Sequence, residues 1–419
     1  MGPVNELNSF YEYQLHCKKL VISIKEFTKN LNFILKHAPN LSLTTNILNK
    51  YPNIENRLEN SIITIDPKLS TDLDDAIGIQ NNILSIYIAN VPLIIEELQL
   101  WSQMSERIST IYLPNGKRTM LSPLLSDNLC SLLENEERFT FCIDIKIIDN
   151  EINISFCNAL IKVRKNYDYN DQKLTTDKDY QKILEFTQIL GQKYKYLKEI
   201  TNSHDVVAYF MILMNVECAK KMSEFKNGIY RAVTINKIKT EVSVSAEIAD
   251  FIKIWQSSSG QYCNYDNKKP HDMINNGVDY IHITSPIRRL VDLLNIIQLQ
   301  QNLSLISWTP ETTAFTTEWM SKLDYINTSM KAIRKVQNDC NILHLCVNKS
   351  TIMEKTYNGY VFDRQERDIY MQYTVYIPDI KVITQIKTKK ELEEYSNHIF
   401  KLYLIENGLK LKRKIRAEM

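Results

Sequence analysis

The sequence has 419 residues, of which 44% are hydrophobic and 24% charged, a balance typical of a folded globular protein rather than a disordered or fibrous one. The 51 Lys and Arg residues nearly cancel the 49 Asp and Glu residues, so the net charge of +2 indicates no general attraction to polyanions. Only 9 residues are glycine, and none forms the glycine patterns of dinucleotide-binding folds, nucleophile elbows or P-loops. These three enzyme classes are therefore disfavoured.

The first part of the chain changes from a helical to a strand pattern. Apolar spacing in residues 1–55 predicts one or two helices. Residues 62–91 contain short apolar runs bounded by Asp, Asn or Pro, which is typical of strands joined by loops. Residues 139–148 and 152–163 alternate in polarity and predict a hairpin that turns at Asp149 and Asn150.

Helical spacing returns in residues 179–225, 285–303 and 313–347, so the middle of the chain is predicted to be rich in helices. From Met353 onward the apolar period drops to two, and charged turns separate the runs. We expect a small β domain here.

The cysteines indicate reduced thiols rather than a metal or redox motif. None of the 8 cysteines forms a CxxC pair. Cys340 and His344 lie four residues apart in a helical pattern, where packing is favoured and a metal site is the alternative. Residues 1–20 have no secretory signal, and no run approaches the roughly 18 apolar residues of a membrane span. We expect an intracellular, cytoplasmic protein that does not contact membranes.

The most informative segment places four aspartates within ten residues, between two apolar runs: Asp66, Asp72, Asp74 and Asp75. Carboxylates crowded at the edge of a core repel one another and resist desolvation unless a cation neutralises them. Magnesium suits such a cluster because it prefers a few carboxylates together with water and phosphate oxygens. A solvated acidic turn is the alternative at this point.

A second segment, Tyr280 to Asp292, reads YIHITSPIRRLVD. Its Ser-Pro pair predicts the start of a helix, with Arg288 and Arg289 in the first turn and Asp292 one turn later. Cations at a helix N-terminus oppose the helix dipole and need a compensating anion. Asp292 could supply that anion, and the functional alternative is a bidentate contact from one arginine to a phosphate.

Taken together, these segments resemble the RNB family of processive 3′-to-5′ exoribonucleases. The metal-binding signature of the family resembles TIDPKLSTDLDDAI, residues 64–77, and its SPIRR block resembles residues 280–292. Between them, residues 107–132 resemble the stretch that follows the first helix of the family, and Met211–Asn215 weakly resemble its Met-x-x-x-Asn helix. The matches occur in the order of the family and span about residues 60 to 300.

The resemblance implies an α+β fold, with an RNB-type catalytic domain of mixed sheets surrounded by helices and a small C-terminal OB-like β-barrel. The expected parts are an N-terminal helical segment at 1–55, the catalytic domain at 56–349 and the barrel at 350–419, a possible RNA-binding unit. The basic run from Lys410 to Arg416 is either a phosphate contact or a solvated strand edge.

The implied activity is magnesium-dependent, processive hydrolysis of single-stranded RNA from the 3′ end, with release of nucleoside 5′-monophosphates by a monomeric enzyme. The four aspartates would hold the scissile phosphate and magnesium, the latter as two ions about 4 Å apart. Asp74 would be the residue most sensitive for catalysis, and Asp75 would also be catalytic. Arg288 would stabilise charge on the phosphate in the transition state. Tyr112 would stack near the 3′ end and help to fix the size of the final product, and Arg289 would also contact RNA.

Several positions depart from the family pattern, which motivates the alternative of a catalytically inactive RNB-fold protein that binds RNA or a partner. The acidic pair that precedes the Met helix is replaced by Ala208 and Tyr209. The strand at 86–91 lacks its His and Asp, and the HFGL block is reduced to 271–274. The tyrosine after the arginines is Leu290, the following His-Arg is Ile296-Ile297, and residues 1–55 leave no room for two cold-shock barrels. These changes affect RNA positioning more than metal binding.

Overall fold

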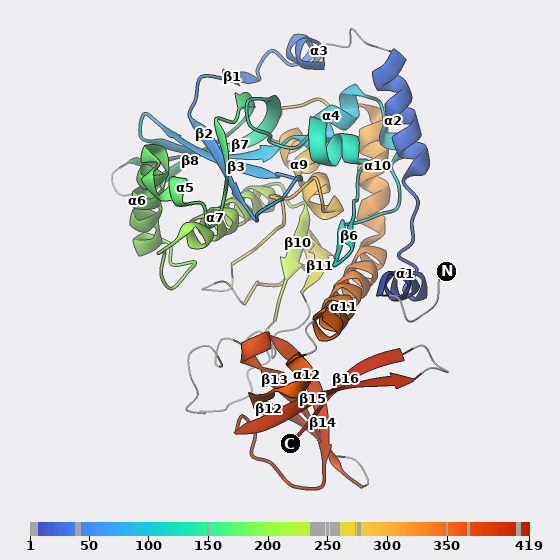
Figure 1. The fold of residues 1–419 in the computed structure, drawn as a ribbon. Helices are drawn as coiled ribbons and strands as arrows, with labels where there is room; N and C mark the ends of the chain where they lie inside the picture. The colour runs from blue at the N-terminus through green and yellow to red at the C-terminus, as the bar shows by residue number, and fades with distance from the viewer. Residues whose placement is uncertain are drawn as a thin grey trace.

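The computed structural model describes residues 7–37, 43–148, 151–234, 248, 251, 260–272, 274, 278–348, 351–366, 369–407 and 412–419. Residues 1–55 were predicted to form one or two helices, but the structure has three there, α1 (Leu7–Cys17), α2 (Lys25–His37) and α3 (Leu43–Lys50). Figure 1 shows them along one side of a large α/β body, with a β unit below this body.

A seven-stranded mixed sheet forms the centre of the larger body, in the order β1-β8-β7-β4-β3-β2-β9. The strands are β1 (Glu55–Arg57), β2 (Ile62–Asp66), β3 (Asp75–Gln80), β4 (Ile83–Ala89), β7 (Glu137–Ile148), β8 (Glu151–Lys162) and β9 (Lys165–Asp168). The predicted hairpin is present, with Ile148 paired to Glu151, although its turn at 149–150 lies outside the described residues.

Alternating residues of the sheet serve two different cores. In β4, Ile86 and Ile88 face one core, whereas Tyr87 and Ala89 face the other. The first core is covered by α5 (Gln172–Thr176), α6 (Lys178–Lys193) and α7 (Ser203–Glu224). The second contains residues of α4 (Val91–Glu97), α9 (Leu290–Asn302), α10 (Pro310–Ser321) and α11 (Leu323–Asn348). Because both faces are covered, the central strands are almost entirely apolar.

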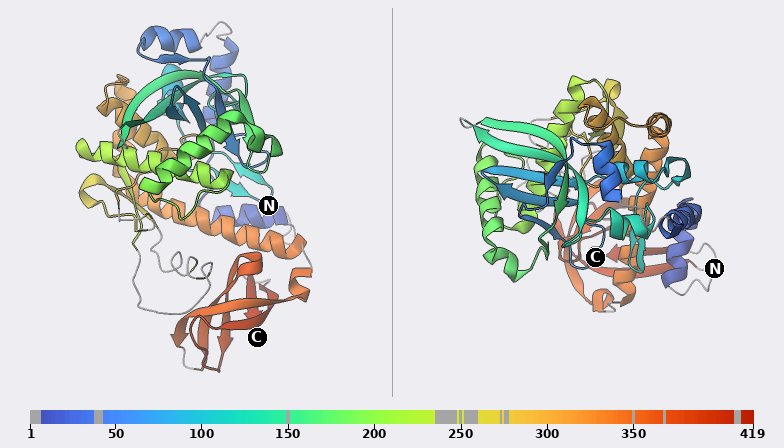
Figure 2. Two further views of the ribbon diagram at one scale, coloured as in Figure 1. Left: turned by 90° about the vertical axis from the view of Figure 1, so that its left-hand side faces the viewer. Right: turned by 90° about the horizontal axis from the view of Figure 1, so that it is seen from above.

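A short hairpin and a second two-stranded sheet complete the larger body. The hairpin joins β5 (Ile111–Leu113) to β6 (Gly116–Arg118), and the sheet pairs β10 (Ile229–Ala232) antiparallel with β11 (Gln261–Asn264). Figure 2 shows the helices wrapped around the curled sheet from two further directions.

The last part of the chain is a five-stranded antiparallel sheet, in the order β14-β13-β12-β15-β16, that closes almost fully into a barrel. Its elements are α12 (Thr351–Glu354), β12 (Thr356–Glu366), β13 (Met371–Ile377), β14 (Val382–Thr388), β15 (Asn397–Asn407) and β16 (Lys412–Glu418). The predicted α+β class, with a small C-terminal barrel, is confirmed. The basic run at 410–416 lies largely outside the described residues and side chains; Arg416 donates to Gln385.

The helix predicted from Ser285 starts later than expected. Helix α9 begins at Leu290, so Arg288 and Arg289 precede it and Asp292 lies in its first turn. The delay arises because this backbone pairs with residues 108–110: Thr110 N donates to Arg288 O, and Leu290 N donates to Ile108 O. The expected conflict between arginines and the helix dipole is therefore wrong, since an acid and not a base occupies the first turn.

Cys340 lies in the core, and His344 contacts the hydroxyl of Tyr11, so this pair serves packing. Among the helices that the structure describes, none combines the length and apolar character that crossing a membrane requires.

Candidate active site

The four aspartates lie on and between two neighbouring strands of the central sheet. Asp66 ends β2 and Asp75 begins β3, and these strands pair antiparallel through Ile63 and Ile77. The loop between them is tied to its surroundings, since Asp74 O accepts from Ala89 N and Leu73 N donates to the Ser131 hydroxyl. The end of β2, the start of β3 and the loop between them together bring the acidic groups to one place.

Asp74 is the structural centre of the group. Its carboxylate is 2% exposed and accepts from Arg288 Nε at 2.7 Å and from Ile287 N at 2.8 Å. The Arg288 side chain is 40% exposed and also donates from Nη2 to the Ser285 hydroxyl. Within the described residues, Nη1 of Arg288 makes no hydrogen bond, so a fixed guanidinium presents a free donor edge beside the carboxylates.

Burial and mutual repulsion raise the pKa of three of these carboxyls. The pKa of Asp74 rises to about 6 because burial outweighs the nearby Arg288. Burial, followed by the neighbouring acids, raises the pKa of Asp66 to about 7 and that of Asp75 well above its usual value. Oδ2 of Asp66 is buried, and the described part of the chain gives it no hydrogen-bond partner. This is the electrostatic signature of a place where a cation would be stabilised.

Asp72 differs from the other three because its partners lie on the β5–β6 hairpin. Lys117 Nζ donates to Oδ1 at 2.8 Å, and the Tyr112 hydroxyl donates to Oδ2 at 2.6 Å. Tyr112 itself is 39% exposed. The structure thus places all four predicted aspartates, Arg288 and Tyr112 in one region, but in different bonding roles.

Arg289 turns toward a separate buried carboxylate. Its Nη2 donates to Asp292 at 2.9 Å and to the Ser285 hydroxyl at 3.1 Å, and its Nη1 lies 3.4 Å from His282 Nδ1. Asp292 in turn accepts from Ser285 N. Arg289 therefore forms the ion pair with Asp292 that was the alternative to a phosphate contact. Arg288 is the arginine that contacts the aspartate group, through Asp74.

Two residues of the site were missed by sequence reasoning. Tyr169 N donates to Asp66 O. Burial raises the pKa of the Tyr169 hydroxyl to about 12, and the negative charges of Asp75 and Asp66 add to this rise. Its ring stacks on His204 with centroids 3.8 Å apart and an 11° interplanar angle. The second missed residue is Lys117, which donates to Asp72. Tyr169 follows β9, which pairs parallel with β2, and nothing in the sequence shows that pairing.

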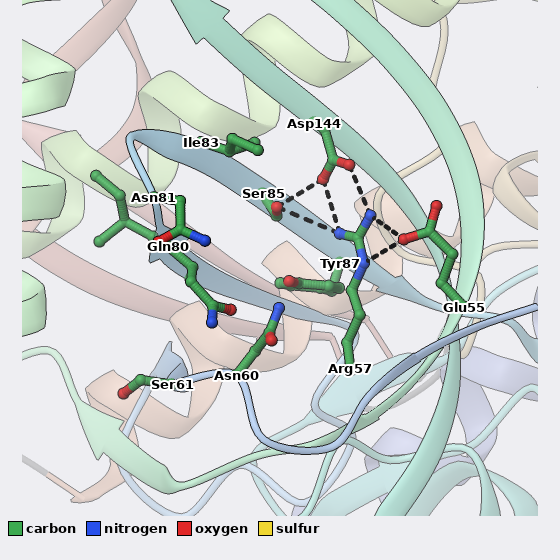
Figure 3. A pocket seen from close by; sticks show the side chains of 12 residues that line it. Glu55, Arg57, Asn60, Ser61, Gln80, Asn81, Ile83, Ser85, Tyr87 and Asp144 are labelled. Atoms are coloured by element: carbon green, nitrogen blue, oxygen red, sulfur yellow. Dashed lines mark hydrogen bonds and ion pairs between the residues drawn. The ribbon is translucent and has the colours of Figure 1, made fainter.

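A hollow of about 210 Å³ lies elsewhere on the sheet and contains none of the predicted site residues. Figure 3 shows Arg57 at its wall, bonded to Glu55, Asp144 and Ser85. Because this guanidinium is already neutralised by two carboxylates, the hollow is a satisfied polar network, and it offers matched control residues for the active site.

The donor set of the aspartate site fits a hard divalent cation. Among the described residues, Asp66 and Asp75 form no ion pair, whereas Asp74 pairs with Arg288 and Asp72 with Lys117. In the parts of the chain that the structure describes, no three His, Cys, Asp or Glu side chains converge into a protein-only metal shell. A magnesium ion held by Asp66 and Asp75 would take its remaining ligands from water and phosphate, as magnesium prefers.

Adding magnesium to the metal-free protein is expected to raise its thermal stability more at pH 8 than at pH 5.5. The folded-state pKa of Asp66, about 7 against an ordinary 3.8, means that protons compete for the site below neutrality and leave as pH rises. At 100 times its dissociation constant a ligand adds about 2.7 kcal/mol. Thermal melting with and without magnesium measures the difference. Asp66→Asn should abolish this pH-dependent gain and Asp144→Asn should retain it; an equal gain at both pH values contradicts the assignment.

Comparison with known proteins identifies a domain over this part of the chain. The RNB domain model matches residues 55–195, which include β1 to β9 and the aspartate loop. Ribonuclease R of Mycoplasmopsis pulmonis is 26% identical over 319 residues, covering 58% of this chain and 44% of that protein, so the chain matches less than half of its relative's length.

Solved structures extend the similarity to the whole fold. The Mycoplasma genitalium RNase R structure in complex with ribose-methylated single-stranded RNA superposes with a TM-score of 0.71, at 18% identity, over 99% of this chain and 78% of the other. Yeast Ssd1, described as a pseudonuclease, gives a TM-score of 0.65 at 15% identity over 80% of this chain and 50% of its own. The chain therefore contains an RNB domain at residues 55–195, and it is similar in fold to RNase R over nearly its whole length.

Proposed function

We propose that this protein is a magnesium-dependent, processive 3′-to-5′ exoribonuclease that hydrolyses single-stranded RNA and releases nucleoside 5′-monophosphates. The observation that carries the proposal is the ion pair between the buried Asp74 and the partly exposed Arg288, within a group of carboxylates whose pKa values are raised. This arrangement holds the Arg288 guanidinium rigidly and leaves its Nη1 group to donate to a phosphate. The RNA-bound relative of the same fold supports the substrate class.

The residues of the chain divide the work of hydrolysis. Magnesium, when bound by Asp66 and Asp75, supplies neutralisation of phosphate charge and activation of water. Arg288, fixed by Asp74, donates from its free edge to a non-bridging phosphate oxygen, where negative charge grows in the transition state. Tyr112 presents a half-exposed ring beside Asp72 for the terminal base. Water adds to phosphorus, and the oxygen of the preceding nucleotide leaves with a proton as a new 3′ hydroxyl.

An exonuclease assay tests the proposal directly. Single-stranded RNA labelled at the 3′ end should yield labelled mononucleotide from the earliest times with magnesium, and none with chelator. RNA labelled at the 5′ end should shorten progressively to a small limit product. If the protein binds RNA but releases no mononucleotide with magnesium, the nuclease proposal is wrong.

That last result would establish the second candidate, a catalytically inactive RNB protein that binds RNA. It is favoured by the replacement of the acidic pair of the family. Ala208 is exposed, and the Tyr209 side chain is buried with a hydroxyl that finds no partner in the described structure. The pseudonuclease Ssd1 has the same fold. Retention of RNA affinity without product release separates this candidate from the first.

A further inference from the structure

One lysine joins three separate elements beside the aspartates. Lys117 Nζ, on β6, donates to the Thr71 hydroxyl at 2.6 Å and to Asp72 at 2.8 Å, both in the loop between β2 and β3. It also donates to Asp127 at 2.8 Å, in the π-helical turn Leu125–Leu129. The ammonium group is therefore fully used by partners from two other parts of the chain.

Tyr112 is the direct cross-strand partner of Lys117 in the β5–β6 hairpin. Side chains of such pairs project from the same face of a hairpin. Here both reach the same carboxylate, Lys117 at Oδ1 and the Tyr112 hydroxyl at Oδ2 of Asp72. The backbone of Tyr112 is held as well, since its N–H donates to Gln337 on α11 at 3.2 Å. The exposed ring is consequently fixed at both ends.

The charges explain why this arrangement depends on Lys117. Asp72 and Asp127 share one ammonium, which is 22% exposed. Burial alone would lower the pKa of Lys117, but hydrogen bonds to Asp127 and Asp72 raise it above its ordinary value. Without the ammonium, two carboxylates would face each other with no cation between them, and like charges at this range repel. Asp72 would then leave the position in which it accepts from Tyr112.

We propose that Lys117 is a positioning residue that fixes the Tyr112 ring through Asp72, and so determines where the 3′-terminal base of a bound RNA comes to rest. This inference rests on the proposed function, because it needs an RNA whose 3′ end reaches Tyr112. It assigns Asp72 to the tyrosine rather than to the metal. Asp66, Asp74 and Asp75 then remain for the cation and the phosphate.

The test uses RNA whose 3′-terminal base is 2-aminopurine, bound to the full-length protein in the presence of chelator so that no cleavage occurs. Stacking on an aromatic ring quenches this fluorophore. We expect quenching in the wild type, loss of quenching with about five-fold weaker binding in Lys117→Met, as expected when a stacked base contact is lost, and recovery in Lys117→Arg. With magnesium, Lys117→Met should also end at a longer limit product, the same change that is expected for Tyr112→Ala.

Arg118→Met is the matched control, because this neighbouring hairpin cation pairs with Glu12 on α1 and not with Asp72. It should quench and bind like the wild type. If Lys117→Met fails to fold, Lys117→Gln takes its place, because the amide removes the charge but keeps a donor for Asp72. The same loss of quenching and the same longer limit product are expected. Unchanged quenching and an unchanged limit product in the Lys117 variants overturn this inference alone. If wild-type protein shows neither RNA binding nor quenching, the proposed function fails, and this inference fails with it.

Discussion

Asp74→Asn is expected to reduce the rate of RNA hydrolysis by about 10²–10³-fold while leaving RNA affinity nearly unchanged. The Asp74 carboxylate, in a residue that is 2% exposed, accepts from Arg288 Nε and Ile287 N, so it fixes the guanidinium that is proposed to contact the phosphate. An amide has one acceptor oxygen instead of two and no charge, so it cannot serve both donors. Single-turnover cleavage of 5′-labelled RNA, together with a binding isotherm, measures the two effects separately.

The matched control for this variant is Asp144→Asn, which also removes a carboxylate bonded to an arginine, Arg57, but does so in the hollow of Figure 3. It should keep the wild-type cleavage rate. Cleavage by Asp74→Asn at the wild-type rate would remove Asp74 from the catalytic machinery.

Arg288→Lys is expected to lower kcat by at least about 10²-fold, although it preserves the positive charge. A lysine ammonium has no second, rigidly attached donor edge, so it cannot pair with Asp74 and reach a phosphate in a fixed geometry. Because the two residues act as a unit, the double variant Asp74→Asn/Arg288→Lys should be little worse than the poorer single variant.

Arg57→Lys is the corresponding control, since Arg57 is likewise bonded to a carboxylate but lies outside the site. Multiplicative losses in the Asp74/Arg288 double variant would show that the two residues act independently. That outcome would contradict the role assigned to their hydrogen bond.

The residue types at the centre of the site could be predicted from the sequence because chemistry restricts them. Crowded aspartates need a cation, and arginine is suited to phosphate, so Asp74 and Arg288 are recognisable without coordinates. Their hydrogen bond is not recognisable, since it depends on how α9 approaches the sheet. Tyr169 was missed for the same reason, because the pairing of β9 with β2 cannot be identified from local sequence. Lys117 lies in a local hairpin, but its bond to Asp72 joins residues 45 positions apart.

Local rules failed where long-range pairing was stronger. The Ser-Pro pair predicts a helix start at Ser285, but the chain stays non-helical to Arg289 because its backbone bonds to residues 108–110. The strand and helix pattern elsewhere was readable because β4, buried on both faces, is a short apolar run and the outer helices keep an apolar face. What periodicity cannot supply is the order of strands in the sheet, and that order is what assembles the acids.

The hydrogen bond between Asp74 and Arg288 joins residues that are 214 positions apart. During synthesis, all four aspartates leave the ribosome long before the arginine that completes them. Contacts of such large sequence separation form late, because closing the intervening loop costs entropy before any contact repays it. A nascent chain therefore carries the acids without the guanidinium, and the RNA-rich ribosome that makes this protein is not exposed to an assembled site until most of the chain has emerged.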